Sequence, residues 1–567
     1  MKTNIRMILY VLACGLALIL WQRWQLAQQP LQADNPVAAT MQEGGQGVPT
    51  SAPAANAAAN GVPVQSANGV PAPAAQGEAS RQLIDVHTDV LHLQIDPQGG
   101  TIVRAELLNY SVSKDDASPL ALMRTDNPRR FLMQSGLVAG GEGMQAPTHA
   151  ALFASAQHEY RLAEGAETLS VPLEWQGDNG VSVRKVYTFK RSEYDFRLEQ
   201  TVNNQGSTPW RGFAYNQLVF GQAANKGGIG QLYTFTGAVT STPDDRYHKI
   251  DLADIRKMQE NRNSLNLLTQ EGWVAMIQHY FLGALIPPQG ESQKFYTIYN
   301  AGDHIVGASS AEQTVAAGSE QRFVMDAYVG PKQQDRLREA APYLDKTVDY
   351  GFLFMIAQPM FKALVFIHSL IGNWGWAIIA MTILIKLIFF VPSAWAYKSM
   401  AKMRKLAPEM QRLKERYGDD RQAMSQAMMR MYREEKVNPA SGCLPMLLQI
   451  PFFIAFYWVL VESVELRQSP WFGWIQDLSV MDPYFILPII NAALMFLQQK
   501  LNPPPPDPVQ AKVMMMLPLI FGFMFMWFPS GLVLYWTVSN AFGIVQQYVM
   551  NKRYGEPRIK PAKPVGT

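Results

Sequence analysis

The chain has 567 residues and a formal net charge of +3, a balance that by itself selects no class of partner. Its two cysteines, Cys14 and Cys443, lie in or beside apolar segments, which excludes a disulfide framework in the polar part of the chain. The sequence is polar up to about residue 345 and is dominated by long apolar runs from about residue 351 onward. We therefore expect a water-soluble part followed by a membrane part.

The N-terminal segment has the pattern of a signal sequence, because Lys2 and Arg6 precede an apolar run over 7–21. The letters VLAC, which end at Cys14, loosely resemble a lipoprotein cleavage box. The apolar run continues for more than a helical turn beyond them, however, and no small-residue cleavage site follows. We predict an uncleaved signal-anchor transmembrane helix over 1–26. Residues 27–80 contain no aromatic residue, Lys or Arg, which predicts a disordered, Ala/Pro/Gln-rich linker on the translocated side.

Residues 81–345 consist of short alternating runs separated by turns, which predicts a large antiparallel β-sandwich. In VLHLQIDPQGG, for example, Leu91, Leu93 and Ile95 share one face of a strand before a Pro/Gly turn. This part shows no metal-ligand spacing, nucleophile elbow or glycine-rich phosphate loop. Its scattered histidines are interpreted as surface or half-buried residues (His87, His92, His279 and His304). We expect no metal site and no cofactor.

The remainder of the chain predicts a polytopic α-helical membrane protein. Residues 346–372 are apolar but contain Pro359 and Lys362, which favours an amphipathic helix in the membrane interface. A true span kinked at Pro359 is the alternative. A core over 373–549 holds five predicted spans: 374–396, 444–461, 484–500, 513–528 and 531–549. Together with the N-terminal anchor they give six predicted transmembrane helices.

The charges of the loops predict the orientation of these spans. Residues 398–436 hold eleven Lys and Arg against six acids, and the tail over 550–567 holds five against one. The loop over 462–482 carries a single Arg and four acidic residues. By the positive-inside rule, both basic segments and both termini lie in the cytoplasm, and the large β domain lies outside.

The basic segment 398–436 has helical periodicity of its own. Its apolar residues follow a 3-4-3-4 spacing in a first helix and form a matching stripe in a second (Met403, Leu406, Met410, Leu413 and Tyr417, then Met424, Met428 and Met431). We predict a cytoplasmic helical hairpin. It has no interleaved aromatic residues as stacking platforms, so we expect no specific nucleic-acid site. A solvated face, or one that docks on acidic lipid, a ribosome or a protein partner, is favoured.

Lys386 is the residue that points to a function. It lies twelve residues from Trp374 and eleven from Tyr397, about 16–18 Å from either end of its span, too far for the side chain to reach the headgroups. A charge at this depth costs about 2.5–3.5 kcal/mol and typically faces protein or water. No other predicted span carries an acid at comparable depth. Polar side chains on the spans therefore predict a hydrated pocket around the lysine (Thr382, Gln449, Asn491, Thr537, Ser539 and Asn540). Each of them alone is more often an ordinary helix–helix contact.

Three segments strongly resemble the YidC/Oxa/Alb family of membrane protein insertases, in its Gram-negative bacterial branch. They are NPASGCLPMLLQIPFFIAFYWVL, SVELRQSPWFGWIQDLSVMDPYFILP and MMMLPLIFGFMFMWFPSGLVLYWTVSN. The resemblance covers nearly the whole chain and is most specific in the core. It implies an inner-membrane insertase and folding chaperone with a periplasmic β domain. It also implies a groove open to the cytoplasm and to lipid, with a basic residue at its centre.

The resemblance assigns roles to particular residues. The groove would be lined by six side chains (Lys386, Thr382, Gln449, Asn491, Tyr535 and Trp536) and flanked by an apolar slide for the client (Met446, Ile450, Phe453, Met515 and Leu519). The hairpin would dock partners through its basic face (Lys402, Arg404, Lys405, Arg412 and Arg416). The implied partners are nascent membrane proteins, membrane lipids, the Sec translocon, and a ribosome or the signal-recognition-particle receptor.

This sequence departs from the family pattern at two places. Lys386 stands where the family has arginine, which keeps the charge but loses the two-pronged fork that clamps a carboxylate. Trp536 follows Tyr535, where enterobacterial relatives tend to have a second tyrosine. Simple electrostatic attraction of an acidic client is therefore expected, without a bidentate clamp.

Two other functions fit parts of the sequence. A small-anion transporter would use Lys386 as its binding charge, although transporters commonly have internal repeats and none is visible here. A membrane-anchored sugar-binding or envelope-assembly protein would leave the lysine and the basic hairpin unexplained. Insertion requires no covalent chemistry, so we do not expect an enzyme.

Overall fold

The computed structural model describes residues 82–554, except for 127–128, 142–143, 222–233, 419, 436–443 and 502–507. The predicted signal anchor over 1–26 and linker over 27–80 lie outside the described residues, as does the tail from residue 555. The chain divides into two compact units. One comprises residues 62–504 and 516–567, and includes all the strands and all the helices except the first half of α11 (Pro508–Met524). The start of α11, up to Met515, belongs to the other unit.

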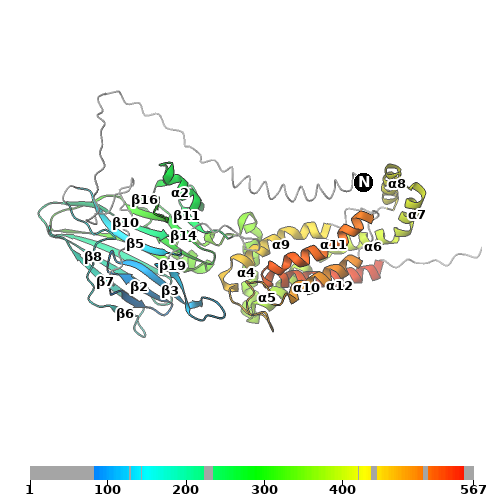
Figure 1. Cartoon of the computed structure of the whole chain (residues 1–567), viewed down its shortest axis with the longest axis horizontal. Helices are drawn as coiled ribbons and strands as arrows, with labels where there is room; N and C mark the ends of the chain where they lie inside the picture. The colour runs from blue at the N-terminus through cyan, green and yellow to red at the C-terminus, as the bar shows by residue number, and fades with distance from the viewer. Residues whose placement is uncertain are drawn as a thin grey trace, which may run out of the picture. The chain divides into compact units, whose positions relative to one another are not determined.

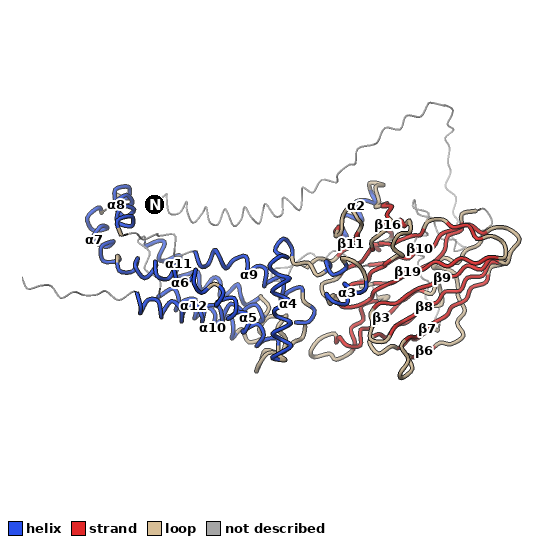
Figure 2. Tube along the Cα trace, turned by 180° about the vertical axis from the view of Figure 1, so that it is seen from behind, coloured by secondary structure: helices blue, strands red, loops and turns tan. Residues whose placement is uncertain are grey.

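Within the described residues, nineteen strands form two sheets that pack face to face (Figures 1 and 2). The larger sheet has eleven strands, of which nine follow the order β13-β16-β17-β10-β5-β3-β2-β1-β6, while β18 pairs with β10 and β4 with β3. Their bounds are β1 Ile84–His87, β2 Leu91–Asp96, β3 Thr101–Ser111, β4 Pro119–Met123, β5 Phe131–Ala139, β6 Glu159–Arg161, β10 Trp210–Phe220, β13 Asn266–Thr269, β16 Gln293–Asn300, β17 Asp303–Ser310 and β18 Gln313–Val315. The pairs are antiparallel except β1–β6, which is parallel.

The smaller sheet has eight strands in the order β12-β11-β14-β15-β19-β9-β8-β7, all antiparallel. Their bounds are β7 Thr168–Gln176, β8 Val181–Lys190, β9 Asp195–Asn204, β11 Gly237–Ser241, β12 His248–Asp251, β14 Trp273–Ile277, β15 Phe281–Ile286 and β19 Ser319–Pro331. Helix α2 (Leu252–Glu260) follows β12 and packs on β16. The predicted antiparallel β-sheet domain is confirmed.

The core of this domain follows from strict alternation along its strands. Leu91, Leu93 and Ile95 of β2 are fully buried, while the residues between them are half-buried on the other face of the sheet. In β9, Phe196 and Leu198 are buried in the same way. Successive side chains of a strand point to opposite faces, so each sheet presents one apolar face, and the two faces close on each other.

After the sheets come a short helix α3 (Gln334–Ala340), two 3₁₀ turns η1 (Leu344–Thr347) and η2 (Gly351–Leu353), and helix α4 (Phe354–Ile371). The segment Gly351–Ile371 is long and apolar enough to cross a membrane. We predicted an interfacial helix here, with a span as the alternative. By length and composition the segment meets the criterion for that alternative, and its placement in the membrane stays a prediction.

The predicted span over 374–396 is not one continuous helix, although its two halves together meet the length and composition criterion for a span. The chain instead forms α5 (Trp374–Ile388) and α6 (Phe390–Lys405), bent by 65° at Phe389. Pro392 lies in the first turn of α6 and has no N–H to donate to Ile388, so the hydrogen-bond ladder breaks where the bend occurs. A proline is tolerated in the first turn of a helix, which explains why α6 restarts there.

The predicted hairpin forms from the end of α6, α7 (Ala407–Tyr417) and α8 (Arg421–Glu434). Its buried residues Leu406, Met431 and Tyr432 form a small cluster with four partly buried neighbours: Met403, Met410, Leu413 and Met428. Most of the predicted apolar seam is therefore confirmed. The Asp420 side chain caps α8 by accepting from the Ala423 N–H.

The remaining helices are α9 (Leu444–Glu462), α10 (Ile486–Leu501), α11 and α12 (Ser530–Tyr554), with 3₁₀ turns η4 (Val464–Leu466) and η5 (Phe525–Trp527). Within the described residues, one helix meets the criterion for a membrane span by length and composition, or two if the bent pair α5–α6 is one span. Three further apolar helices are shorter. The predicted count of six spans is not confirmed.

Candidate substrate groove

Lys386 lies on the last turn of α5 and is half-buried. Its Nζ donates to Oε1 of Gln449, on α9, at 2.9 Å. Within the described residues, this amide oxygen is the hydrogen-bond partner of the ammonium, and no carboxylate forms an ion pair with it. An ammonium carries three donors, so two remain for water or for a ligand.

Gln449 connects the lysine to α12. Its amide nitrogen donates to Oγ of Ser539 at 2.8 Å and lies 3.5 Å from the hydroxyl of Tyr535. Because both amide donors point toward α12, the amide oxygen is the end that faces Lys386. The result is a chain of neutral polar groups that holds the ammonium without neutralising its charge.

Two other predicted groove residues make different contacts. Thr382 is buried one turn before Lys386, and its hydroxyl donates to Ile378 O of its own helix at 2.7 Å. Asn491 on α10 is fully buried and accepts from the Asn540 amide at 2.8 Å. Sequence reasoning expected both beside the lysine, yet their polar groups serve a helix turn and a helix–helix contact. Ser539, a candidate among the polar residues of the spans, contacts Gln449 directly.

An aromatic wall stands next to this polar chain. The fully buried Tyr535 stacks on Phe453 of α9, with ring centroids 6.0 Å apart. Trp536 meets Phe453 edge-on at 4.3 Å and Phe525 at 5.0 Å. The polar chain thus ends against an apolar wall that α9, α12 and η5 build together.

Comparison with known proteins agrees with this arrangement of parts. Two family models match the chain, the YidC periplasmic domain over residues 83–363 and the 60Kd inner membrane protein over residues 366–557. The membrane protein insertase YidC of Thioalkalivibrio sulfidiphilus is 44% identical over 97% of this chain and 98% of its own length. That of Alkalilimnicola ehrlichii is 48% identical over 85% of each chain.

The chain belongs to the YidC family of membrane protein insertases. As a member of this family it is a protein of the inner membrane. A crystal structure of an active YidC insertase with the first transmembrane domain resolved has a TM-score of 0.39 and 19% identity to it, covering 83% of this chain and 93% of that chain.

Three of the five residues predicted for the apolar slide of this YidC family member have exposed side chains. The exposed fractions are 41% for Ile450 on α9 and 56% and 67% for Met515 and Leu519 on α11. Phe453 is partly buried against the aromatic wall. The side chain of Met446 lies outside those that the structure describes. Apolar groups this exposed would be unfavourable in water, and they suit contact with lipid or with an apolar client.

The predicted docking residues of the hairpin are exposed where the structure describes them (Lys402, Lys405, Arg412 and Arg416); the side chain of Arg404 is not described. They lie on α6 and α7, and none of them belongs to the apolar cluster around Leu406. These positions leave a basic surface free of contact with the hairpin's own core.

The loop between α9 and α10 is held by its own acidic residues. Asp482 caps α10 by accepting from the Leu487 N–H at 2.8 Å, and it also accepts from Trp474 Nε1 at 3.0 Å. Arg467 in the same loop donates to Ser111 O, at the end of β3, at 2.8 Å. Asp482, one of the four acidic residues used to predict the orientation of the spans, therefore also has a structural role in this member of the YidC family.

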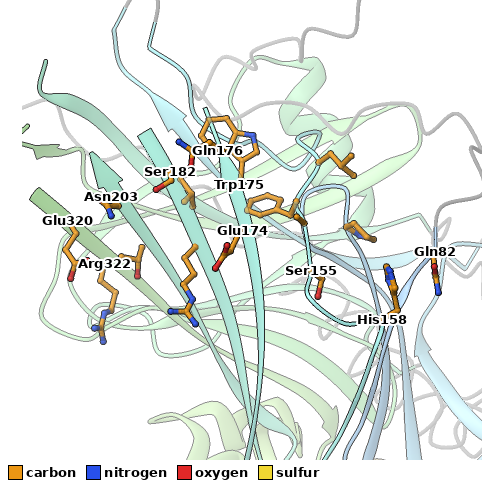
Figure 3. A pocket seen from close by; sticks show the side chains of 17 residues that line it. Gln82, Ser155, His158, Glu174, Trp175, Gln176, Ser182, Asn203, Glu320 and Arg322 are labelled. Atoms are coloured by element: carbon orange, nitrogen blue, oxygen red, sulfur yellow. The ribbon is translucent and has the colours of Figure 1, made fainter. Parts of the chain in front are cut away.

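The β domain contains a separate cavity of about 1220 Å³ over β7, β8, β9 and β19 (Figure 3). Polar and charged side chains line it, among them Glu174, Arg184, Glu320 and Arg322. Sequence analysis assigned no residue to it, because its lining comes from strands more than a hundred residues apart.

Proposed function

We propose that this protein inserts newly made membrane proteins into the inner membrane and helps them fold, and that the polar chain around Lys386 is its working centre. The observation that carries this proposal is the hydrogen bond from Lys386 to Gln449. An ammonium whose described partner is a neutral amide is not neutralised by an ion pair, and such a group within an apolar helix is a functional feature by default. No covalent step is required.

The mechanism rests on the cost of moving polar groups through hydrocarbon. A hydrated groove lowers this cost for the polar flank of a client, and Lys386 attracts acidic residues in that flank. At about 4 Å and an effective dielectric constant near 20, such an attraction amounts to about 4 kcal/mol. A lysine supplies it as a point charge, without a two-pronged clamp.

The apolar segment of the client would move along the exposed side chains of α9 and α11. Met515 and Leu519 contribute to this surface. Methionine side chains are flexible and polarisable, which suits clients of different shapes. The segment would then partition into lipid, because both surroundings are apolar.

Topology and partners follow from the same reasoning. The distribution of Lys and Arg supports cytoplasmic termini, a cytoplasmic hairpin and a periplasmic β domain. The exposed basic residues of α6 and α7 would bind a ribosome, the signal-recognition-particle receptor or acidic lipid, and the Sec translocon would cooperate with the helical core. For 346–372 we keep the interfacial position as the proposal.

A small-anion transporter is the competing function, since it would use the same charge. Photocrosslinking separates the two. Probes at positions 386, 449 and 536 should crosslink to stalled nascent chains of membrane proteins. Proteoliposomes that hold this protein alone should take up no small anion. Uptake without a client, together with a failure of all three probes, would favour the transporter.

A further inference from the structure

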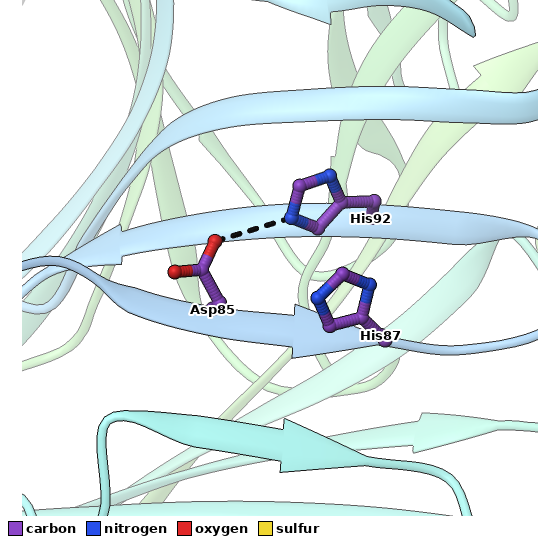
Figure 4. A group of neighbouring side chains, drawn as sticks. All are labelled: Asp85, His87 and His92. Atoms are coloured by element: carbon purple, nitrogen blue, oxygen red, sulfur yellow. Dashed lines mark hydrogen bonds and ion pairs between the residues drawn. The ribbon is translucent and has the colours of Figure 1, made fainter.

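Three potential metal ligands converge on the outer face of the β1–β2 hairpin (Figure 4). His87 and His92 lie directly opposite each other in the antiparallel ladder. Asp85 lies two residues before His87, on the same face of β1, and is opposite Gln94. Thr88 sets the turn by accepting the Leu91 N–H at 2.9 Å. The alternation that buries Ile84 and Val86 places Asp85 and His87 on the solvent side, where they are half-buried.

The ligand atoms are close together. The two imidazole rings stack with centroids 4.2 Å apart and planes 5° apart. His92 Nε2 lies 3.1 Å from Asp85 Oδ1, and one ligand atom from each of the three residues lies within 4.8 Å of the others. Metal bonds of 2.0–2.1 Å in a tetrahedral site place neighbouring ligand atoms about 3.3 Å apart. The His92–Asp85 pair is already near that spacing.

A second set of residues orients these ligands. Glu106, opposite His92 on β3, lies 2.8 Å from His92 Nδ1, and Arg104 in turn holds Glu106 at 2.6 Å. Gln94 donates to Asp85 Oδ1 at 3.1 Å. A carboxylate on the far nitrogen of a histidine, itself hydrogen-bonded, is the arrangement that fixes metal-binding histidines in proteins.

His92 thus has a carboxylate at both ring nitrogens. A neutral imidazole has one N–H and can donate to one of them only, so the other nitrogen presents a lone pair to a carboxylate oxygen. A cation held between His92 Nε2 and Asp85 Oδ1 would occupy that contact.

We propose that Asp85, His87 and His92 bind a divalent late transition-metal ion of the Zn²⁺ type, with a fourth position open to water. Two imidazoles and one carboxylate suit Zn²⁺, Cu²⁺ and Ni²⁺ rather than Mg²⁺ or Ca²⁺. The ligand atom of His87 lies within 4.8 Å of the other two, and a rotation of its side chain would bring it to bonding distance of the ion. Arg161 lies beside His87 on β6 but pairs with Glu159, so its charge is already offset.

The sequence did not reveal this site, because its ligands are spaced along a β-hairpin. A D-x-H-x₄-H pattern matches no helical or zinc-finger motif, and only the pairing of the two strands places its members on one face. The site lies on the larger sheet and is independent of the groove, so the insertase function and this proposal stand or fall separately.

The test uses the untagged full-length protein in detergent, stripped of metal, with Zn²⁺ titrated against a chromophoric chelator. We expect one Zn²⁺ per chain, with affinity reduced at least tenfold in His87→Gln and in His92→Gln. Glu106→Gln should weaken binding by about tenfold to a hundredfold while leaving the three ligands in place. Co²⁺ in place of Zn²⁺ should give the visible absorption of a tetrahedral centre.

The matched control is His248→Gln, which removes an exposed histidine 3.1 Å from Asp245 without a third ligand nearby. It should leave Zn²⁺ binding unchanged. Circular dichroism and the melting temperature in the absence of metal establish that the His87 and His92 variants are folded. Zn²⁺ binding that is absent in the wild type, or that persists in a folded His87→Gln/His92→Gln double variant, would overturn the proposal.

Discussion

Lys332 Nζ, just after β19, lies 2.8 Å from Glu462 Oε2 at the end of α9, and both side chains are almost completely buried, with exposed fractions of 3% and 6%. Lys332 also donates to Thr347 O at 3.2 Å. This ion pair joins the last strand of the β domain to a helix of the core. Removing one partner of such a pair leaves a buried charge, which is far more destabilising than removing both.

Lys332→Met should therefore lower the free energy of unfolding by about 3–5 kcal/mol. The double variant Lys332→Met/Glu462→Gln should recover most of this loss, because no unpaired charge remains. Thermal unfolding of the full-length protein in detergent measures both. Asp326→Asn, which breaks the exposed Arg197–Asp326 pair, is the control and should change stability by less than about 1 kcal/mol. Equal destabilisation by the single and double variants would contradict the role of the charge.

The same pair affects deletion of the β domain. Deleting the strands together with Lys332 leaves Glu462 without its ion-pair partner. We expect the deletion carrying Glu462→Gln to accumulate to higher levels than the deletion alone, and to retain most insertion activity. Immunoblotting of membranes and a protease-protection assay of a client report the two quantities. Complete loss of insertion by a folded, well-expressed deletion would assign the β domain an essential role.

Sequence periodicity predicted the structure where the information is local. The alternation of Leu91, Leu93 and Ile95 and the apolar stripe around Leu406 each lie within one or two elements, and the structure places these side chains in the cores as expected. The bend at Phe389 also had a local signal in Pro392, which the hydropathy of the surrounding run concealed. Apolar composition thus indicated the membrane segment but not the bend within it.

Contacts between elements that are far apart in the sequence were harder to predict. Gln449 is 63 residues from Lys386, and sequence analysis predicted it only as one of several polar side chains on the spans. Which of these would point toward the lysine depends on helix rotation. Thr382 and Asn491 are as suitable by type, yet their hydrogen-bonding groups are used elsewhere. The pairing of His87 with His92 likewise depends on the strand register.

The charge of Lys386 should matter more than its shape. Lys386→Arg should retain insertion, whereas Lys386→Glu should slow insertion of clients with acidic translocated flanks by about tenfold, or about 1.4 kcal/mol in the barrier. Clients with neutral flanks should be affected less. In vitro insertion into proteoliposomes measures the rates. Equal rates for both variants with acidic clients would remove electrostatic attraction from the mechanism.

Gln449 provides a way to neutralise this charge without removing the lysine. Gln449→Glu would place a carboxylate where the amide oxygen now accepts from Lys386, and an internal ion pair should form. We expect insertion of clients with acidic flanks to fall, as with Lys386→Glu, while the protein remains as stable as the wild type. Ser539→Ala is the control, since it removes a partner of Gln449 without changing charge. Undiminished insertion by a folded Gln449→Glu variant would show that the net charge of the groove is unimportant.

The pH dependence of stability should reveal the titration of a buried lysine in the β domain. Lys185 on β8 is fully buried, donates to Gly99 O at 2.6 Å and to Ser135 Oγ at 2.9 Å, and burial lowers its pKa to about 7. Between this pKa and the ordinary value of 10.5 the unfolded chain binds more protons. The contribution of Lys185 to stability is thus present above pH 10.5 and is lost as pH falls toward 7.

The free energy of unfolding should therefore rise from pH 7 to pH 10, by at most about 1.4 kcal/mol per pH unit from this one group. Lys185→Met should flatten that slope, because methionine has a similar length and nothing to titrate. Lys190→Met, on the same strand but with an exposed side chain, should leave the slope unchanged. Scanning calorimetry of the β-domain transition at several pH values measures these slopes. An identical slope in the wild type and in Lys185→Met would mean that the buried amine stays charged, held as an ammonium by the backbone carbonyl and the hydroxyl around it.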